Sequence, residues 1–239
     1  MGLLALAIAP GIAICLFIYF KDKYNREPIW MLILSFVLGV LSIVPAVLVQ
    51  LAYGTEIATI QNEGYLSVAF FAYCIVALSE EASKFLMLML FMYRRKHFDD
   101  PFDGIVYAVM ISMGFATLEN VGYVLEHGVG TGILRMFLSV PAHATFAVLM
   151  GYFTGLAKFR DMHKFYYFFM ALLLPVFFHG SFDFFLFLGE PGLLTLGALV
   201  AFILAVYLSF RAIRRKQQLS KLYYEEKKII VIPDEAPSL

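Results

Sequence analysis

Seven long apolar runs dominate this sequence, and they constrain its fold more than any other feature. They cover about residues 2–20, 29–52, 66–93, 102–125, 134–157, 165–188 and 192–210. A helix needs about 20 mostly apolar residues to cross a bilayer, because the hydrocarbon layer is about 30 Å thick. Of the 239 residues, 62% are hydrophobic and 15% are charged, whereas a soluble domain has about 45–50% and about 25%. The sequence therefore predicts an all-α, polytopic membrane bundle of about seven transmembrane helices.

The positions of lysine and arginine predict how this bundle is oriented. Sixteen of the 18 Lys and Arg residues follow the first, third, fifth and seventh runs, and the loops between the other run ends contain none. Cytoplasmic loops of membrane proteins carry an excess of Lys and Arg. We therefore predict that the N-terminus lies outside and the C-terminus in the cytoplasm. Residues 1–210 are expected to form the transmembrane domain, and residues 211–239 a cytoplasmic tail that is basic and then acidic.

Several other classes of protein are excluded by what the sequence lacks. Its two cysteines, Cys15 and Cys74, both lie in apolar runs and build neither a disulfide framework nor a cysteine zinc motif. We find no internal repeat, no glycine-rich phosphate loop and no nucleic-acid motif, and the basic loops are explained by topology. The first run has no basic segment before it and no clear cleavage site, so we interpret it as a permanent helix.

A small set of ionisable residues lies inside the apolar runs. A charged side chain at the centre of a membrane helix costs about 2.5–3.5 kcal/mol, so such residues face the bundle interior, pair with one another and mark functional sites. Away from the ends of the runs, they are Glu80, Glu81, Lys84, Glu119, His143, His179 and Asp183.

Helical spacing predicts which of these groups meet. Lys84 lies four residues after Glu80 and three after Glu81, so its ammonium can neutralise either carboxylate. The two glutamates point about 100° apart on a helix of 3.6 residues per turn, so one of them can face a cavity. His179 and Asp183 lie one turn apart, where the carboxylate can orient the imidazole and raise its basicity.

The predicted orientation also gives the depth of these groups. At 1.5 Å per residue, Glu119 lies about 9 Å from the outer end of its run, and His143 and His179 about 14 Å. Glu80 and Glu81 are nominally deeper, but their run is long enough to tilt or to emerge at its outer end. We therefore expect carboxylates and imidazoles from four helices to form one layer in the outer half of the membrane.

Two chemistries suit such a layer, and both hydrolyse peptide bonds. In the first, a carboxylate acts as general base on water while a histidine donates to the oxyanion. In the second, His and Glu side chains hold a Zn²⁺ ion that activates water, and another Glu remains as the base. The candidate ligands for that ion are Glu81, Glu119, His143 and His179.

Simpler interpretations of each group also exist. Glu80, Glu81 and Lys84 together suit a structural ion-pair cluster, His143 a hydrogen-bonded core histidine, and the His179–Asp183 pair a contact between helices. Asn120, beside Glu119, is typical of an interhelical hydrogen bond. At the level of the whole protein, buried Glu, His and Asp residues also occur in proton-coupled transporters and channels. A non-catalytic membrane receptor or scaffold is the remaining alternative.

The segments around these residues resemble the PrsW family of intramembrane proteases. The resemblance covers about residues 7–187 and is carried, in order, by APGIA, KDKYNREP, LSEEASK, FDGIVYA, GFATLEN, His143 with the following MGYFTG, and FHGSFDF. It is distantly shared with the CAAX-prenyl-protease and bacteriocin-processing superfamily. Phe115 begins an FxxxE version of a motif that ends with His in that superfamily, so Glu119 stands where the superfamily has a histidine.

This resemblance implies a function in the plasma membrane of a bacterium. A protease of this family makes the first, site-1 cut in a single-pass anti-sigma factor on its extracytoplasmic side, and a second intramembrane protease then releases the sigma factor. It implies that Glu80, Glu81 and His179 are the first candidates for catalysis, together with Glu119 and His143, and that Lys84, Asp183 and Asn120 support them. Such proteases are classed as metallopeptidases or as glutamic peptidases, so a bound Zn²⁺ is one of two expectations.

Overall fold

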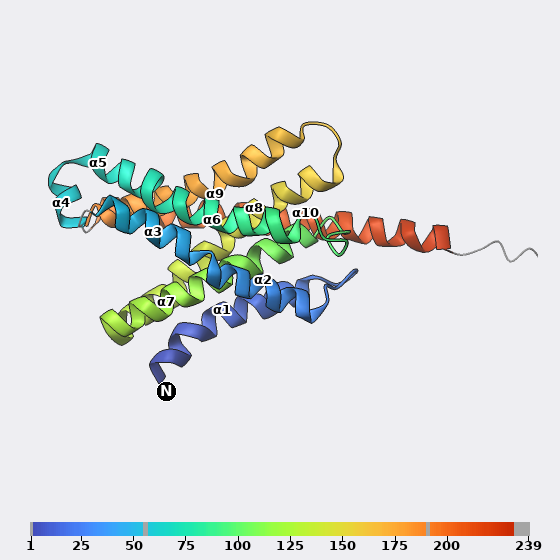
Figure 1. Ribbon diagram of the computed structural model, residues 1–239, viewed down its shortest axis with the longest axis horizontal. Coiled ribbons are helices and arrows are strands. Elements are labelled where there is room, and N and C mark those ends of the chain that lie inside the picture. Colours follow the sequence, from blue (N-terminus) through green and yellow to red (C-terminus); the bar gives the residue numbers. More distant parts are fainter. Residues whose placement is uncertain (1, 55–56, 190–191, 232–239) are drawn as a thin grey trace, which may run out of the picture.

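The structure, a computed structural model, describes residues 2–54, 57–189 and 192–231, and helices occupy every predicted apolar run (Figure 1). The helices are α1 Gly2–Lys21, α2 Ile29–Leu41, α3 Ile43–Tyr53, α4 Ile57–Asn62, α5 Tyr65–Phe70, η1 Phe71–Ala77, α6 Leu78–Met87, η2 Leu88–Met92, α7 Asp103–Phe137, α8 Ser139–Phe159, α9 Lys164–Phe187 and α10 Leu193–Val231. Within the described residues there is no β-strand. The prediction of an all-α fold is therefore confirmed.

Five helical stretches of the described chain are long and apolar enough to cross a membrane. They are Gly2–Lys21, Ile29–Tyr53, Asp103–Phe159, Lys164–Phe187 and Leu196–Glu226. The third stretch contains α7 and α8, which are two of the predicted runs. The run at 66–93 is absent from the five because it is divided among α5, η1, α6 and η2. The protein is a polytopic helical membrane protein, while the number of seven passes and the sides of the termini remain predictions.

Two prolines explain where long apolar runs break into separate helices. Proline has no N–H to bond the carbonyl four residues earlier, and its ring clashes with that carbonyl. Pro45 lies four residues after Leu41, where α2 ends, and Pro141 lies four residues after Phe137, where α7 ends. By contrast, α1 and α9 continue through Pro10 and Pro175. Two of the four prolines that lie inside the apolar runs therefore coincide with helix breaks.

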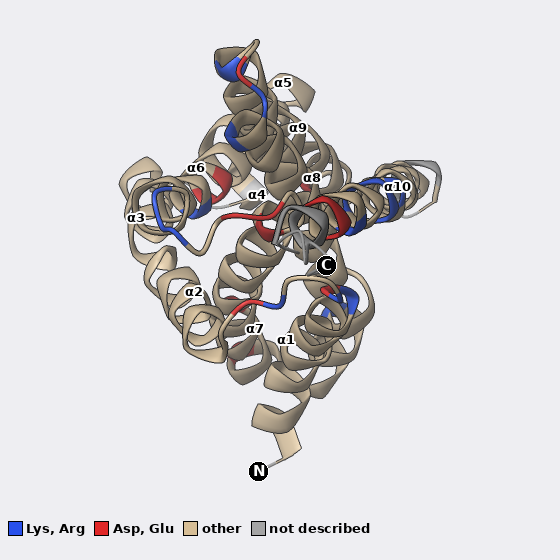
Figure 2. Cartoon of the chain, turned by 90° about the vertical axis from the view of Figure 1, so that its right-hand side faces the viewer, with Lys and Arg blue, Asp and Glu red and all other residues tan. Residues whose placement is uncertain are grey.

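Helix α7 forms the centre of the bundle, and almost every side chain from Asp103 to Thr117 is buried. It packs against α1, α2 and α8 (Figures 1 and 2). The contact with α2 is close because Gly39 faces the backbone of Ile111 and Gly114 faces the backbone of Phe36, with no room for a Cβ atom. Small residues allow such close approach between membrane helices.

The chain reverses direction within α7, at Gly128. This glycine has φ 80° and ψ −164°, which are non-helical values that favour glycine. Beyond it the chain turns back alongside the first part of α7 and leads into α8 (Figure 1). The turn brings Arg135, on the returning segment, back to the level of Glu119, and the two side chains form an ion pair.

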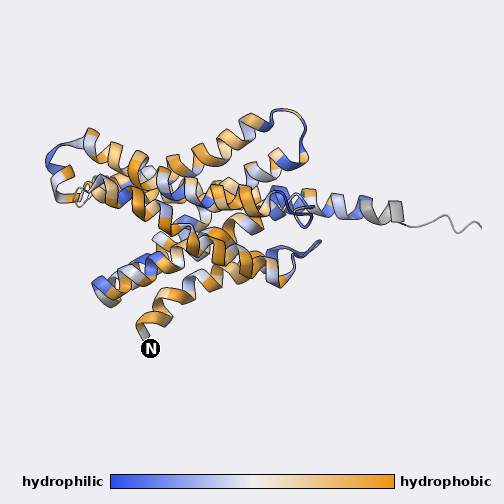
Figure 3. Ribbon diagram, in the orientation of Figure 1, coloured by the Kyte–Doolittle hydropathy of each residue, from blue (hydrophilic) through white to orange (hydrophobic). Residues whose placement is uncertain are grey.

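The outer surface of the bundle is apolar along the helices and polar at their ends. Large apolar side chains are exposed there, including Leu66 and Phe165, which suits contact with lipid. Hydrophilic residues gather in the connecting segments and in the later part of α10 (Figure 3). Lys and Arg residues lie at the end that contains the loops after α1, η2 and α8 (Figure 2). This is the end that the sequence predicts to be cytoplasmic.

Four buried carboxyl groups form what we name the acidic end cluster at the predicted cytoplasmic end: Asp22, Glu27, Asp100 and Asp103. Asp103 Oδ2 accepts hydrogen bonds from the backbone N–H groups of Asp99 and Asp100, at 2.9 and 2.6 Å. Asp22 Oδ2 accepts one from the Glu27 N–H, and Tyr107 donates to Glu27. These bonds tie the loop after α1 to the start of α7.

Burial has an electrostatic consequence for the two members of this cluster that lie in the loop after α1. Removal from water disfavours a charged carboxylate. Burial therefore raises the pKa of Asp22 to about 7 and the pKa of Glu27 to about 7. In each case hydrogen bonds oppose the shift but do not cancel it.

Candidate active site

The residues of the LSEEASK motif lie on α6, a helix of ordinary α geometry between two π-helical segments. Bonds from Leu78 N–H to Tyr73 O and from Tyr93 N–H to Leu88 O span five residues, one more than in an α-helix. Such wide turns are rare and occur frequently at functional sites. Between them, α6 presents its polar face, which includes Glu80, Glu81 and Lys84, to the bundle interior, where all three are buried.

The Lys84 ammonium lies at the centre of a polar network. It donates to Glu81 Oε1 at 2.8 Å, to Glu80 Oε2 at 3.3 Å and to His143 Nδ1 at 3.3 Å. It also lies 4.0 Å from the centre of the Phe115 ring, where the ring's electron density attracts a cation. Lys84 thus pairs with both glutamates at once, whereas the sequence left open which of them it neutralises.

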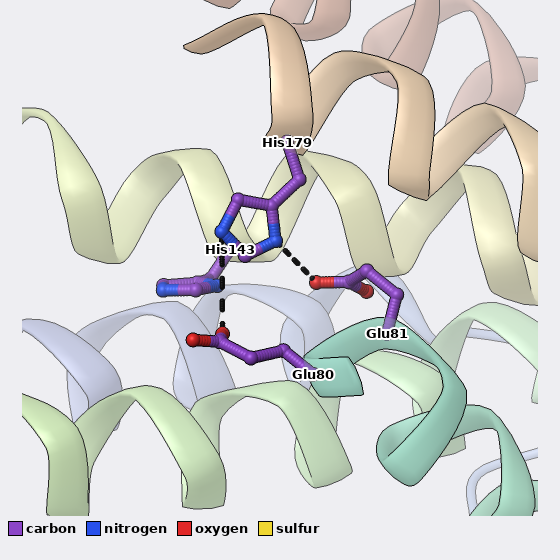
Figure 4. A group of neighbouring side chains, drawn as sticks. All are labelled: Glu80, Glu81, His143 and His179. Atoms are coloured by element: carbon purple, nitrogen blue, oxygen red, sulfur yellow. Dashed lines mark hydrogen bonds and ion pairs between the residues drawn. The ribbon is translucent and has the colours of Figure 1, made fainter. Parts of the chain in front are cut away.

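His179 joins α9 to this network through both of its ring nitrogens. Nδ1 lies 2.9 Å from Glu81 Oε1, and Nε2 lies 3.1 Å from Asp183 Oδ2 and 4.0 Å from Glu80 Oε2 (Figure 4). A ring with carboxylates on both nitrogens donates from both when it is protonated. The Asp183 carboxylate therefore orients the imidazole, as the i,i+4 spacing predicts.

His143 joins α8 to α7 on the other side of Lys84. Its Nε2 lies 3.0 Å from Glu119 Oε2, and the same oxygen lies 2.8 Å from Arg135 Nη2. The His143 and His179 rings meet edge to face with 5.0 Å between their centres. Four helices thus bring the seven predicted ionisable residues into one continuous network.

Asn120 and Gln50 each form a hydrogen bond with a charged side chain of this network. Asn120 Nδ2 donates to the backbone carbonyl of Ala7 at 2.9 Å, and its Oδ1 accepts from Arg135 Nε at 3.0 Å. It therefore bonds between helices, in agreement with its position beside Glu119. Gln50 on α3 donates to Glu80 Oε1 at 3.3 Å. Sequence reasoning missed Gln50 and Arg135, although each is a rare polar residue near an apolar run, which is the signal that could have identified them.

A cavity of about 420 Å³ opens beside the network. Glu80, Glu119, His143, His179 and Asp183 line it, whereas Glu81 and Lys84 lie behind them. Its remaining walls are mostly aliphatic and aromatic side chains from α3, η1, α8 and α9, and they also include Ile57, Tyr123 and Arg135. Size and lining are those of a site that admits part of a polypeptide together with water.

Four of these residues could hold a metal ion. Glu80, Glu81, His143 and His179 each offer one ligand atom, and these atoms lie within 4.8 Å of one another. In the described residues they are the one group of this kind. Carboxylate oxygens and imidazole nitrogens are the ligands of catalytic zinc sites. Glu81 Oε2 is buried and has no hydrogen-bond partner, so the residues fit a bound cation.

The charges of the network support the same fit. Four carboxylates, those of Glu80, Glu81, Glu119 and Asp183, face two permanent cations, those of Lys84 and Arg135. With both histidines neutral, this leaves two negative charges in excess, which one divalent cation or two bound protons would balance. Lys84 contacts three of the four candidate ligands, so a metal ion there would share or replace those contacts.

The set of candidate ligands differs in one member from the sequence prediction. Glu119 was predicted as a ligand, but its Oε2 is held by Arg135 and His143 Nε2, and it lies outside the group of four. Glu80 takes its place. The physical reason is the return of the chain at Gly128, which supplies Glu119 with a cation that the linear sequence places in another run.

Comparison with known proteins identifies the family. Residues 27–210 match the model of the PrsW family intramembrane metalloproteases. The chain is similar to Protease PrsW of Geobacillus kaustophilus, with 40% identity over 76% of this chain and 78% of that protein. It is also similar to Protease PrsW of Bacillus subtilis, with 38% identity over 77% and 83%, and to that of Oceanobacillus iheyensis, with 36% over 89% and 96%.

No solved structure matches the chain. The match to the family model covers α2 to α9 and the first part of α10. It therefore includes every residue of the network except Ala7. The helices, the buried Glu and His side chains and the similarity over most of the chain lead to one conclusion. This multi-pass bacterial membrane protein belongs to the PrsW family of intramembrane proteases.

Proposed function

We propose that this peptidase makes the first, site-1 cut in a single-pass anti-sigma factor, on the extracytoplasmic side of the membrane. The cut would begin regulated intramembrane proteolysis that releases a sigma factor. The observation that carries the proposal is the cavity lined by Glu80, His143 and His179, which joins a possible base, proton donors and space for a peptide in one site. Family membership supports the peptidase activity.

Glu80 is the better placed of the two α6 glutamates to act as the base. It lines the cavity, whereas Glu81 is fully buried behind it and is held by Lys84 and His179. In this proposal Glu80 accepts a proton from the attacking water, and Glu81 fixes the orientation of His179. His179 lines the cavity and donates a proton from Nε2 to the oxygen or nitrogen of the cleaved peptide group, as a positioned general acid does.

The residues that would hold a metal are Glu81, His143 and His179, which leaves Glu80 beside the water. Three protein ligands with an open fourth position are typical of catalytic zinc sites. When bound there, the ion would make water more acidic and stabilise negative charge on the peptide oxygen. Glu80, Asp183 and Glu119 would keep their roles as base, as partner of His179 and as partner of His143.

The position of the cavity supports a cut near the outer end of the substrate helix. Its walls include Ile57 at the start of α4 and Phe187 at the end of α9, at the end of the bundle opposite the Lys- and Arg-rich loops (Figures 1 and 2). A helical substrate hides its peptide groups in its own hydrogen bonds and must unwind before water attacks. Unwinding costs least where the freed N–H and C=O groups meet water.

The test is reconstituted cleavage of single-pass candidates by the purified protein in lipid nanodiscs, with mass spectrometry of both fragments. We expect a cut at or just outside the outer end of the substrate helix, and an intact cytoplasmic part. Helix-breaking residues near the cut should accelerate it. A cut in the cytoplasmic half of the helix would contradict the proposed orientation, and uncleaved substrates together with proton flux in liposomes would favour a transporter.

Metal analysis of the same active preparation separates the two chemistries. The metal-dependent chemistry is supported if the active protein contains a stoichiometric metal, if chelation removes the metal and the activity together, and if adding the metal back restores the activity. Full activity after the metal has been removed supports catalysis by Glu80 and His179 alone. Glu126→Gln serves as the matched control, because this exposed carboxylate lies outside the cavity.

A further inference from the structure

Arg135 is a partly buried cation that neither the motifs nor the predicted catalytic set includes. It lies on the segment that returns after Gly128, and its side chain is 13% exposed. Its guanidinium covers the face of Tyr123, 4.0 Å from the ring centre. A cation buried in this way does not serve as an anchor for lipid headgroups. Its partners lie inside the protein.

Two polar contacts fix the guanidinium between α1 and the cavity. Nε donates to Asn120 Oδ1 at 3.0 Å, and Asn120 is itself bonded to the carbonyl of Ala7 in α1. Nη2 lies 2.8 Å from Glu119 Oε2. Arg135 therefore connects the fixed end of α1 to a carboxylate in the cavity wall, and its planar fork holds both partners in one geometry.

The contact with Glu119 also determines how His143 carries its proton. A carboxylate only accepts hydrogen bonds, so the 3.0 Å contact between Glu119 Oε2 and His143 Nε2 requires an N–H on Nε2. In the neutral ring Nδ1 then has the free lone pair. This agrees with the position of the Lys84 ammonium, a donor, 3.3 Å from Nδ1.

We propose that Arg135 is a positioning residue for the peptidase reaction: it holds the Glu119 carboxylate in place, and through it keeps His143 in the Nε2–H tautomer. The lone pair on Nδ1 then faces the side of the cavity where Glu80, Glu81 and His179 meet. The inference rests on the proposed function, because it assigns His143 a part in the same reaction. In this proposal the cation acts on the reaction through two other side chains, those of Glu119 and His143.

The first test is a double-mutant cycle with Arg135→Met, Glu119→Gln and the two changes together. We expect Arg135→Met to lower kcat by about 10- to 100-fold, the usual cost of losing a partner that orients an active-site ligand, with KM unchanged. Because the effect passes through Glu119, the double variant should be no worse than Glu119→Gln alone. Arg135→Lys, which keeps the charge, should recover part of kcat, and Arg214→Met, an exposed arginine on α10, should match the wild type.

The second test reads the histidine itself and needs no cleavage. In protein labelled with ¹⁵N-histidine, the nitrogen shifts of His143, assigned with His143→Gln, should show the Nε2–H tautomer in the wild type. They should show a mixture of tautomers in Arg135→Met. This separates the inference from the proposed function, since a wild-type protein that cleaves no candidate substrate still reports its tautomer.

Three results would overturn the inference. One is a double variant whose fold-loss in kcat equals the product of the losses in Arg135→Met and Glu119→Gln, because residues that act independently give that result. Another is a rise in KM alone, which would mean that Arg135 contacts the substrate. The third is an Nε2–H tautomer that survives in folded Arg135→Met. Arg135→Lys and the charge-neutral double variant keep the test valid if the single Met variant does not accumulate.

Discussion

The polar network at the cavity and the acidic end cluster bury carboxylates at opposite ends of the bundle, but they satisfy them in different ways. In the network, Glu80, Glu81 and Glu119 face the side-chain cations Lys84 and Arg135 beside a cavity of about 420 Å³. In the end cluster, Asp103 and Asp22 accept hydrogen bonds from backbone N–H groups. Bonds to backbone fix a loop, whereas paired side chains beside a cavity remain available for chemistry.

The difference gives a rule for interpreting buried charge in this protein. A carboxylate whose oxygens are occupied by backbone donors is needed for the fold, and its loss should reduce stability. A carboxylate that shares a cation and lines a cavity is needed for the reaction, and its loss should reduce activity. The rule would be contradicted by a substitution in the end cluster that lowers activity without lowering stability. It would equally be contradicted by a substitution in the network that lowers stability without lowering activity.

The largest expected effect is on the network. Glu80→Gln and His179→Ala should each abolish measurable cleavage, because loss of a positioned general acid or base costs roughly 10²- to 10⁴-fold. Glu81→Gln should do the same, because His179 then loses the carboxylate that orients it. Gln keeps the volume and the hydrogen bonding of Glu but cannot take a proton. Cleavage of a reconstituted substrate is measured together with the amount of inserted protein. Wild-type turnover by Glu80→Gln/Glu81→Gln would refute the proposed chemistry.

The two fully buried lysines sharpen the comparison, since each is 1% exposed. Lys84 contacts three ionisable groups of the network, whereas Lys216 on α10 lies near Tyr152 and Gly155. Removing one partner of a buried pair costs about 3–5 kcal/mol, so Lys84→Met should lose stability and activity together. Lys84→Arg should retain more activity than Lys84→Met or Lys84→Glu, because the cation is what balances the carboxylates.

Lys216→Met supplies the matched control for this test. It removes a lysine side chain from an equally buried position outside the network, so cleavage per folded molecule should equal that of the wild type. Turnover numbers are normalised to the folded fraction, measured by size-exclusion chromatography. Normal accumulation and cleavage by Lys84→Met would show that the pairing in the network is unimportant.

In the end cluster the expected effect is on stability. Asp103→Ala removes the acceptor of two backbone N–H groups, and a buried donor without a partner costs about 1–3 kcal/mol. Thermal unfolding in detergent should therefore occur at a lower temperature, while the kcat of the folded fraction stays at the wild-type value. A fall in kcat with unchanged unfolding temperature would place this cluster in the reaction and remove the distinction between the two regions.

The sequence was sufficient to predict the helices and the members of the network, for two physical reasons. The length of an apolar run is set by the bilayer, and an ionisable residue inside such a run has few explanations other than a site. Spacing along one helix also gave the Lys84 and Asp183 contacts correctly. These are local relations, which a single sequence contains in full.

Contacts between distant segments could not be predicted in the same way. The Glu119–Arg135 pair depends on the reversal at Gly128, and the Gln50–Glu80 contact depends on how α3 packs beside α6. The acidic end cluster was missed because three of its residues lie in loops and Asp103 lies at the start of a helix, where charged side chains are usually solvated. Burial there results from the packing of the loop after α1 against the start of α7 and α10.

The smallest expected effect is the dependence of stability on pH that the end cluster contributes. The pKa of Asp22 and that of Glu27 are each raised to about 7 by burial. A raised carboxyl pKa means that the folded state binds the proton more tightly than the unfolded state does. The stabilisation is therefore complete below the unfolded values, near 4, and is lost as pH rises through 7. The charged and titratable groups facing this pair are Arg26, Asp99, Asp100, Asp103 and Tyr107.

From pH 6 to pH 8, Glu27 should lose on the order of 1 kcal/mol of stabilisation, the amount that corresponds to a shift of about one pKa unit. The unfolding temperature of the wild type should fall over this range. Glu27→Gln should flatten the dependence, because its amide oxygen still accepts from Tyr107 while no proton is gained or lost. Glu126→Gln, an exposed control, should keep the wild-type slope. Equal slopes for Glu27→Gln and the wild type would show that Glu27 neither gains nor loses a proton between pH 6 and pH 8, which would contradict a pKa of about 7 for this carboxyl group.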